Sequence, residues 1–252
     1  MYLSINAAKV YGWQHLTYIG IYFALFAVSL TLILLKVKSK EKIDLLVKIF
    51  GGVLLAMIIV NRITIAFHKE SAWFLLPDSF CGVGSLALAI CCLFLKRGAL
   101  PYHVFVYCML FGGLIVTFYP DFIGQKFHGE ATPFLYPATI SGMLHHSFAF
   151  YISVFLLATG HFKPCVKKTY ALPIALCFMI TYGTFLIDAC GFETAMYVGS
   201  PLVPKTFLTW YVVFPALVVA GYGIAFLYEY LVKRNGQNDE PTQVENNEST
   251  SE

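Results

Sequence analysis

Residues 141–157 read "SGMLHHSFAFYISVFLL" and place two adjacent histidines inside an otherwise apolar run. The run extends over residues 137–159, which exceeds the roughly 20 residues that a helix needs to cross a bilayer. Neighbouring side chains on a helix diverge by about 100°, so His145 and His146 cannot both face lipid without a large cost. The stretch therefore predicts a membrane-spanning helix that turns at least one histidine toward the interior of a helical bundle.

The composition of the whole chain also predicts a membrane protein. The 252 residues are 58% hydrophobic and 12% charged, whereas a soluble domain is about one quarter charged. Seven stretches are apolar enough to span a bilayer, at residues 16–35, 44–67, 79–95, 102–119, 137–159, 170–190 and 207–232. We predict an all-α fold, a polytopic membrane bundle of seven transmembrane helices that forms a single domain over residues 1–234.

The distribution of lysine and arginine predicts how the bundle is oriented. The loops after the first, third, fifth and seventh stretches hold most of these residues, whereas the alternate loops hold one lysine each and no arginine. The N-terminus is then outside and the C-terminus inside, as in a multi-pass protein of the cell membrane. The polar, acidic tail 235–252 is expected to be a disordered cytoplasmic segment. The small net charge of +3 argues against a nucleic-acid partner.

In this orientation, the polar residues of the spans share one depth near the outer face. They are His15, Asn61, Arg62, Cys81, Asp121, His145, His146 and Asp188. Because polar groups buried in a membrane usually line a cavity or pair with one another, we expect a common cavity there. Other roles stay open for three of them: Asp121 ends a helix in headgroup water, His15 joins an interfacial aromatic belt, or Arg62 extends outward to water.

Within the histidine pair, the sequence favours His146 as the functional residue. One helical turn earlier, His146 has Gly142, which leaves space for a ligand or a partner side chain. His145 has Ser141 at the same spacing, and this residue offers a local hydrogen-bond partner that suits a structural role. Purely structural hydrogen bonding by both histidines remains the alternative.

The sequence predicts no metal and no cofactor. Histidines that bind one zinc ion from a single helix are spaced i and i+4, which adjacent histidines are not. A site built from His15, His146 and Asp188 on three helices is a weaker alternative. The seven cysteines show no CxxC spacing, and no glycine-rich nucleotide-binding pattern is present.

A series of short motifs resembles a known family. The motifs are "QHL" at 14–16, "LP" followed by a cysteine at 76–81, "YPD" at 119–121, a histidine within the fifth stretch, and "D…MYVGSP" at 188–201. In their order and spacing the chain is similar to the YwaF-like integral membrane proteins, which are grouped with the transmembrane protein 164 family of acyltransferases. The resemblance covers nearly the whole chain, from about His15 to Pro201.

The resemblance implies a phospholipid-directed acyltransferase or acyl hydrolase with membrane lipids as partners. In such relatives a cysteine and a histidine move an acyl chain between phospholipids through a thioester. The resemblance implies that Cys81 is the nucleophile and His146 is the base, and that Asp188 or Asp121 orients the histidine. Further substrate contacts are expected from His15, Arg62, Asp121 and His145.

The chain departs from this family pattern at the nucleophile. Asp78 and Ser79 stand where eukaryotic relatives have cysteine followed by histidine, and Cys81 follows about one helical turn later. A second hypothesis is therefore a non-enzymatic heptahelical binder or sensor, which holds a lipid or small ligand in the same cavity. The histidine pair would then form hydrogen bonds or sense pH. A disulfide between Cys81 and Cys190 would favour this alternative, because it removes the thiolate.

Overall fold

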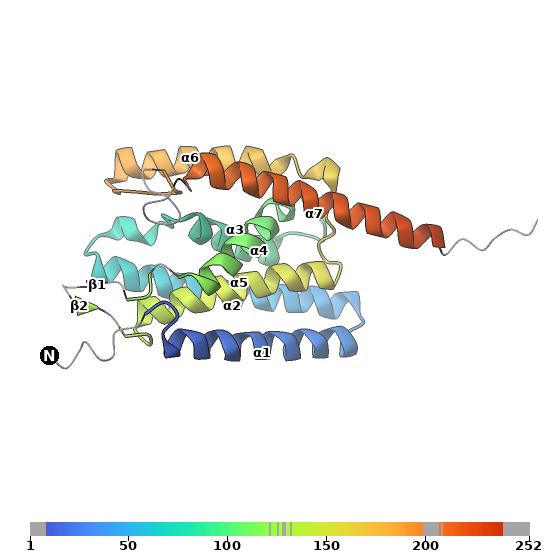
Figure 1. Ribbon diagram of the computed structural model, residues 1–252, viewed down its shortest axis with the longest axis horizontal. Coiled ribbons are helices and arrows are strands. Elements are labelled where there is room, and N and C mark those ends of the chain that lie inside the picture. Colours follow the sequence, from blue (N-terminus) through green and yellow to red (C-terminus); the bar gives the residue numbers. More distant parts are fainter. Residues whose placement is uncertain are drawn as a thin grey trace, which may run out of the picture.

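The computed structural model describes residues 9–120, 122–124, 126–127, 130–131, 133–198, 207 and 209–238. Seven α-helices make up most of this part of the chain (Figure 1): α1 (Trp13–Lys36), α2 (Lys40–His68), α3 (Phe80–Phe94), α4 (Tyr102–Phe118), α5 (Pro137–Ala158), α6 (Ala171–Cys190) and α7 (Trp210–Asn238). The connections contain two 3₁₀ turns, η1 (Ala72–Leu75) and η2 (Val166–Lys168), and a short antiparallel hairpin, β1 (Lys126–Phe127) with β2 (Glu130–Ala131). The prediction of an all-α fold is confirmed for the described residues, apart from this hairpin.

Five of the predicted spans are long and apolar enough to cross a membrane. They are α1, α2, α5, the segment Val166–Cys190 that contains α6, and residues Trp210–Arg234 of α7. The other two helices, α3 and α4, are also apolar but have only 15 and 17 residues. These lengths fall short of the roughly 20 residues that a bilayer core requires. The chain is thus a membrane protein, and its described residues contain five helices long enough to span a bilayer and two shorter apolar helices.

The predicted boundary between the membrane domain and the tail, at residue 234, falls within α7. Helix α7 continues to Asn238, beyond the boundary at residue 234 that the sequence predicted. The rest of the predicted tail, residues 239–252, lies outside the described residues.

Helices α2, α3, α4 and α5 form the centre of the bundle, with α4 packed against α5 and α2 packed against both α3 and α5. Helices α6 and α7 pair on one side and contact α4, whereas α1 lies against α5 on the opposite side (Figure 1). The only residue that α1 buries is His15. Two tyrosine hydroxyl groups attach α1 to α5. Tyr18 Oη lies 2.6 Å from Ser147 Oγ, and Tyr22 Oη donates to the Ser147 carbonyl oxygen at 2.8 Å.

The contact between α4 and α5 depends on a glycine. A Cβ atom at Gly113 would lie 2.7 Å from the His146 carbonyl oxygen and 3.0 Å from Phe150 Cβ. Both are closer than ordinary van der Waals contact, and the first involves backbone that cannot rotate away. Glycine here lets two helix backbones approach, as small residues commonly do in membrane bundles.

Replacing Gly113 by alanine should therefore destabilise the protein. We expect the free energy of unfolding in detergent micelles to fall by about 2 kcal/mol, because forced overpacking costs about 1–3 kcal/mol. This loss outweighs the roughly 1 kcal/mol that alanine gains over glycine inside a helix. Gly52→Ala is the matched control, since a Cβ at Gly52 meets nothing closer than Leu93 Cδ2 at 3.9 Å. Equal stability changes for the two variants would contradict the close approach of α4 and α5.

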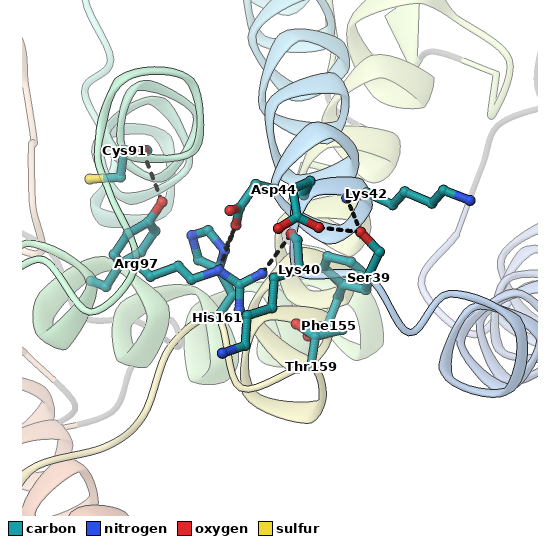
Figure 2. A network of polar contacts seen from close by, with 11 residues as sticks. Ser39, Lys40, Lys42, Asp44, Cys91, Arg97, Phe155, Thr159 and His161 are labelled. Carbon is teal, nitrogen blue, oxygen red and sulfur yellow. Dashed lines mark hydrogen bonds and ion pairs between the residues drawn. The ribbon is translucent and has the colours of Figure 1, made fainter.

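Near the N-terminal end of α2, an ion-pair network joins Asp44 to Arg97 and His161, which lie in two different loops (Figure 2). Arg97 Nε lies 2.7 Å from Asp44 Oδ1, and Arg97 Nη2 donates to the Lys40 carbonyl oxygen at 2.9 Å. His161 Nδ1 lies 3.0 Å from the same carboxylate, at an angle outside hydrogen-bond geometry. Burial and the Arg97 charge lower the pKa of His161 below its ordinary value, although Asp44 acts in the opposite direction. The network ties the start of α2 to the loops that follow α3 and α5.

Candidate active site

Cys81 lies in the first turn of α3, directly after a capped helix start. Ser79 is the N-cap, and its Oγ accepts a hydrogen bond from the Gly82 amide at 3.0 Å. The thiol is buried, with 4% of the residue's surface exposed. The unpaired amides of a first turn form the positive end of the helix dipole. A cysteine in this position is more easily held as a thiolate than one in the middle of a helix.

An ion pair covers the same helix start. Arg62 on α2 donates from Nη1 to Asp78 Oδ1 at 2.8 Å, and the same nitrogen lies 3.4 Å from the Leu76 carbonyl oxygen. Its other terminal nitrogen faces α3, because a Cβ at Gly82 would lie 3.6 Å from Arg62 Nη2. The sequence predicted Arg62 as a site residue, but it indicated no role for Asp78. The sequence signal for this ion pair was an arginine inside one apolar stretch and an aspartate directly before the next stretch.

An apolar cavity of about 320 Å³ lies beside Cys81, between α3, α4 and α7. Its lining residues are Phe80, Cys81, Phe111, Gly112, Ile115, Val116, Tyr197, Val212, Val213, Ala216, Leu217 and Ala220. Among these, only Cys81 and Tyr197 carry a sulfur or an oxygen in the side chain. Ile115 and Ala216 are exposed on the outside of the bundle, so the cavity reaches the surface between α4 and α7. Cys81 is the one predicted site residue, among those described, that lines this cavity.

The two histidines of α5 are both buried but differ in their hydrogen bonds. His145 Nδ1 donates to the Ser141 carbonyl oxygen at 2.9 Å, which confirms the predicted local partner through its backbone. His146 Nδ1 is buried and has no hydrogen-bond partner among the described residues. A buried polar atom without a partner is uncommon in native proteins and often marks a functional position.

The expected divergence of the two histidine rings is not observed. Their centroids lie 3.9 Å apart with the planes tilted by 38°, because side-chain rotations bring together rings whose Cα–Cβ bonds point apart. The space that Gly142 leaves is filled by Phe122, since a Cβ at Gly142 would lie 2.9 Å from the Phe122 ring. The Phe122 ring also stacks on His146 at a centroid distance of 5.9 Å. A partner side chain, one of the two predicted occupants, therefore takes this space.

Cys81 and His146 lie at the same level of the bundle, on two sides of α4. A Cβ at Gly112 would lie 2.9 Å from Cys81 Sγ, and a Cβ at Gly113 would lie 2.7 Å from the His146 carbonyl oxygen. These two glycines are adjacent, so one turn of α4 contacts both α3 and α5.

The remaining predicted site residues are placed elsewhere. His15 is fully buried, with Nδ1 accepting from the Tyr11 amide at 3.1 Å and Nε2 donating to the Thr117 carbonyl oxygen at 3.0 Å. Nε2 therefore joins α1 to α4, whereas Nδ1 makes a local contact with the residues just before α1. Asp188 is exposed near the end of α6 and makes no ion pair or hydrogen bond with the described residues. Asp121 lies outside the described residues.

The thiols and carboxylates form neither a disulfide nor a metal site in the part of the chain that the structure describes. None of the seven cysteines, including Cys81 and Cys190, forms a disulfide. No group of three or more histidine, cysteine, aspartate or glutamate side chains converges there as metal ligands would. The Cys81 thiol is thus not held in a disulfide.

A comparison of the sequence with known proteins places these features in a family. The chain matches the TMEM164 family over residues 10–230. This region contains the Cys81 cavity, the Arg62–Asp78 ion pair and the histidine pair. No curated protein and no solved structure shows a significant match. Because the matched region covers far more than half of the residues, the chain belongs to the TMEM164 family.

Proposed function

We propose that this membrane protein transfers or hydrolyses the acyl chains of membrane lipids, with Cys81 as the nucleophile. The observation that carries the proposal is the position of the thiol on the wall of an apolar cavity of about 320 Å³. Apolar walls suit a hydrocarbon chain, because burying it there removes it from polar surroundings. A cavity that reaches the outside of the bundle also lets such a chain enter from the bilayer.

The reaction has two steps, and the same base carries one proton in each. The Cys81 thiol gives its proton to the base, and the thiolate attacks the carbonyl carbon of a lipid ester. The ester C–O bond breaks, and the leaving alkoxide takes that proton. A hydroxyl group of an acceptor lysolipid, or water, then gives its own proton to the base and attacks the thioester. The C–S bond breaks, and the leaving thiolate takes this second proton to restore the thiol. A lysolipid acceptor gives transfer and water gives hydrolysis.

Two features support the assignment of the polar residues to this reaction. The helix dipole of α3 and the Arg62 guanidinium both place positive charge near Cys81, which stabilises a thiolate. His146 is the proposed proton carrier, since it is buried at the level of Cys81 and keeps Nδ1 without a partner among the described residues. Asp78 is the proposed carboxylate of the site, because it holds Arg62 at the helix start. This role differs from the one that the resemblance implied for Asp188 or Asp121, which was to orient the histidine.

The test is to trap the thioester. The purified protein is placed in nanodiscs that contain a phosphatidylcholine with alkyne-tagged acyl chains, and is quenched in acid. We expect one acyl adduct, removable by neutral hydroxylamine, on the tryptic or chymotryptic peptide that contains Cys81. Mass spectrometry of that peptide gives the position and the stoichiometry.

The matched control for this experiment is another buried thiol. Cys108 on α4 is fully buried and does not line the cavity. Cys108→Ala should keep the adduct, and Cys81→Ala should lack it. An adduct that survives in Cys81→Ala would rule out Cys81 as the nucleophile.

A lipid-binding protein without catalysis is the second candidate function. The same apolar cavity favours it, because its walls alone are sufficient to hold an acyl chain. In that case tagged phosphatidylcholine copurifies with the protein in a fixed ratio and no thioester forms at any time. The trapping experiment therefore distinguishes the two functions.

A further inference from the structure

The loop between α6 and α7 contains a tight turn with an unusual backbone. Residues 195–198 form a two-residue hairpin, in which the Val198 amide donates to the Ala195 carbonyl oxygen at 2.7 Å. The two central residues, Met196 and Tyr197, have φ angles of 52° and 62°. Turns of this shape normally carry asparagine and glycine, because other side chains are strained in the left-handed region. Such strain persists only where surrounding contacts hold it, and it gathers at functional sites.

Contacts on both sides of the turn hold it in place. The Met196 side chain is buried against α6, where a Cβ at Gly183 would lie 2.8 Å from Met196 Cβ. The Met196 amide donates to the Asp78 carbonyl oxygen at 3.1 Å. Asp78 leads into the helix that carries Cys81. The turn is thus fixed to the same segment that positions the thiol.

The turn brings Tyr197 to the wall of the Cys81 cavity. Its ring packs against Phe80 and Phe214, with centroid distances of 6.1 Å and 6.4 Å. Among the described lining residues, Tyr197 supplies the one hydroxyl group, in a cavity whose other walls are apolar apart from the thiol. In apolar surroundings a hydrogen bond to a developing charge is worth much more than in water.

We propose that Tyr197 is a catalytic residue that donates a hydrogen bond to the carbonyl oxygen of the acyl group attacked by Cys81. When the thiolate adds to the carbonyl carbon, the oxygen becomes an anion, and a donor fixed in advance stabilises it. The phenol keeps its proton throughout, so no bond to Tyr197 forms or breaks. This inference rests on the proposed acyl-transfer function, and it explains why a strained turn of two large residues stands beside an apolar cavity.

The experiment compares Tyr197→Phe with the unmodified protein in a single turnover of the tagged phosphatidylcholine. We expect thioester formation to slow by about 10²–10³-fold, the usual effect of removing one donor to an oxyanion. The affinity for an ether-linked phosphatidylcholine, which has no carbonyl group, should change less than twofold. Phenylalanine keeps the ring that packs on Phe80 and Phe214, so the ether-lipid affinity also reports whether the cavity is intact.

Tyr107→Phe is the matched control, because Tyr107 is fully buried, its hydroxyl has no partner among the described residues, and it does not line the cavity. Its thioester formation should match that of the unmodified protein. An unchanged rate in Tyr197→Phe would overturn the role of Tyr197 while leaving Cys81 as the nucleophile. A parallel loss of rate and of ether-lipid affinity would assign Tyr197 to packing and overturn it as well. An unmodified protein that forms no thioester would overturn the proposed function and this inference together.

Discussion

Replacing His146 by alanine is expected to slow acyl transfer by about 10²–10⁴-fold, the range that general acid–base catalysis usually supplies. The reason is that His146 has a ring nitrogen without a partner among the described residues and lies at the level of Cys81. The measurement is the single-turnover rate of thioester formation from tagged phosphatidylcholine, with the melting temperature in detergent recorded for the same sample.

The adjacent histidine provides the control. His145→Ala should lower the free energy of unfolding by about 1–3 kcal/mol through loss of the bond to the Ser141 carbonyl oxygen, and should slow thioester formation less than His146→Ala. Since the rings lie 3.9 Å apart, the two substitutions are not independent, and the double variant measures their coupling. The assignment would be reversed if His145→Ala lost the activity and His146→Ala kept it.

Replacing Asp78 by asparagine is expected to lower the free energy of unfolding by about 3 kcal/mol. Removal of one partner of a buried ion pair costs about 3–5 kcal/mol, because the other charge stays buried without compensation. The low end applies, since the Arg62 side chain is 11% exposed but that of Asp78 is 33% exposed. Chemical unfolding in mixed micelles gives the measurement.

Two further variants separate the ion pair from other effects. Asp44→Asn breaks the ion pair with Arg97, in which the side chain of Asp44 is 43% exposed and that of Arg97 is 28% exposed. This variant should lower the free energy of unfolding by about 1 kcal/mol or less. The double variant Arg62→Met with Asp78→Asn should recover most of the lost stability, because it leaves no unpaired charge. A double variant as unstable as Asp78→Asn alone would show that Asp78 stabilises the helix start by some other contact.

Hydropathy along the sequence was sufficient to predict the seven helices. In lipid, an apolar segment must satisfy its backbone hydrogen bonds internally, and a helix does so. The prediction that α3 and α4 also span the membrane stays a prediction, because these helices have 15 and 17 residues. The start of α3 is fixed by Ser79, whose hydroxyl caps the first turn, and apolar composition does not report such local capping.

The proposed site combines residues that the sequence singled out with two that it did not, and these two share one physical cause. Cys81 and the histidine pair stand out in the sequence, because polar residues in apolar runs are costly. Asp78 and Tyr197 do not, because their roles arise from tertiary contacts with segments far away in the chain. The turn at Tyr197 even breaks the usual residue preferences, so only the contacts that hold it explain its shape.

The attachment of α1 has a consequence for how the protein is made. This helix is synthesised first, but the serine that binds its tyrosine hydroxyls lies 129 residues later than Tyr18, on α5. Ribosomes add about 5–20 residues per second, so α1 waits roughly 6–26 s before that serine exists. During this interval α1 can contact α4, through the bond from His15 Nε2 to the Thr117 carbonyl oxygen, but it cannot yet contact α5. Most of its apolar side chains therefore depend on lipid until α5 is made. Its position at the edge of the bundle (Figure 1), with His15 as its one buried residue, fits a helix whose contact with α5 forms late.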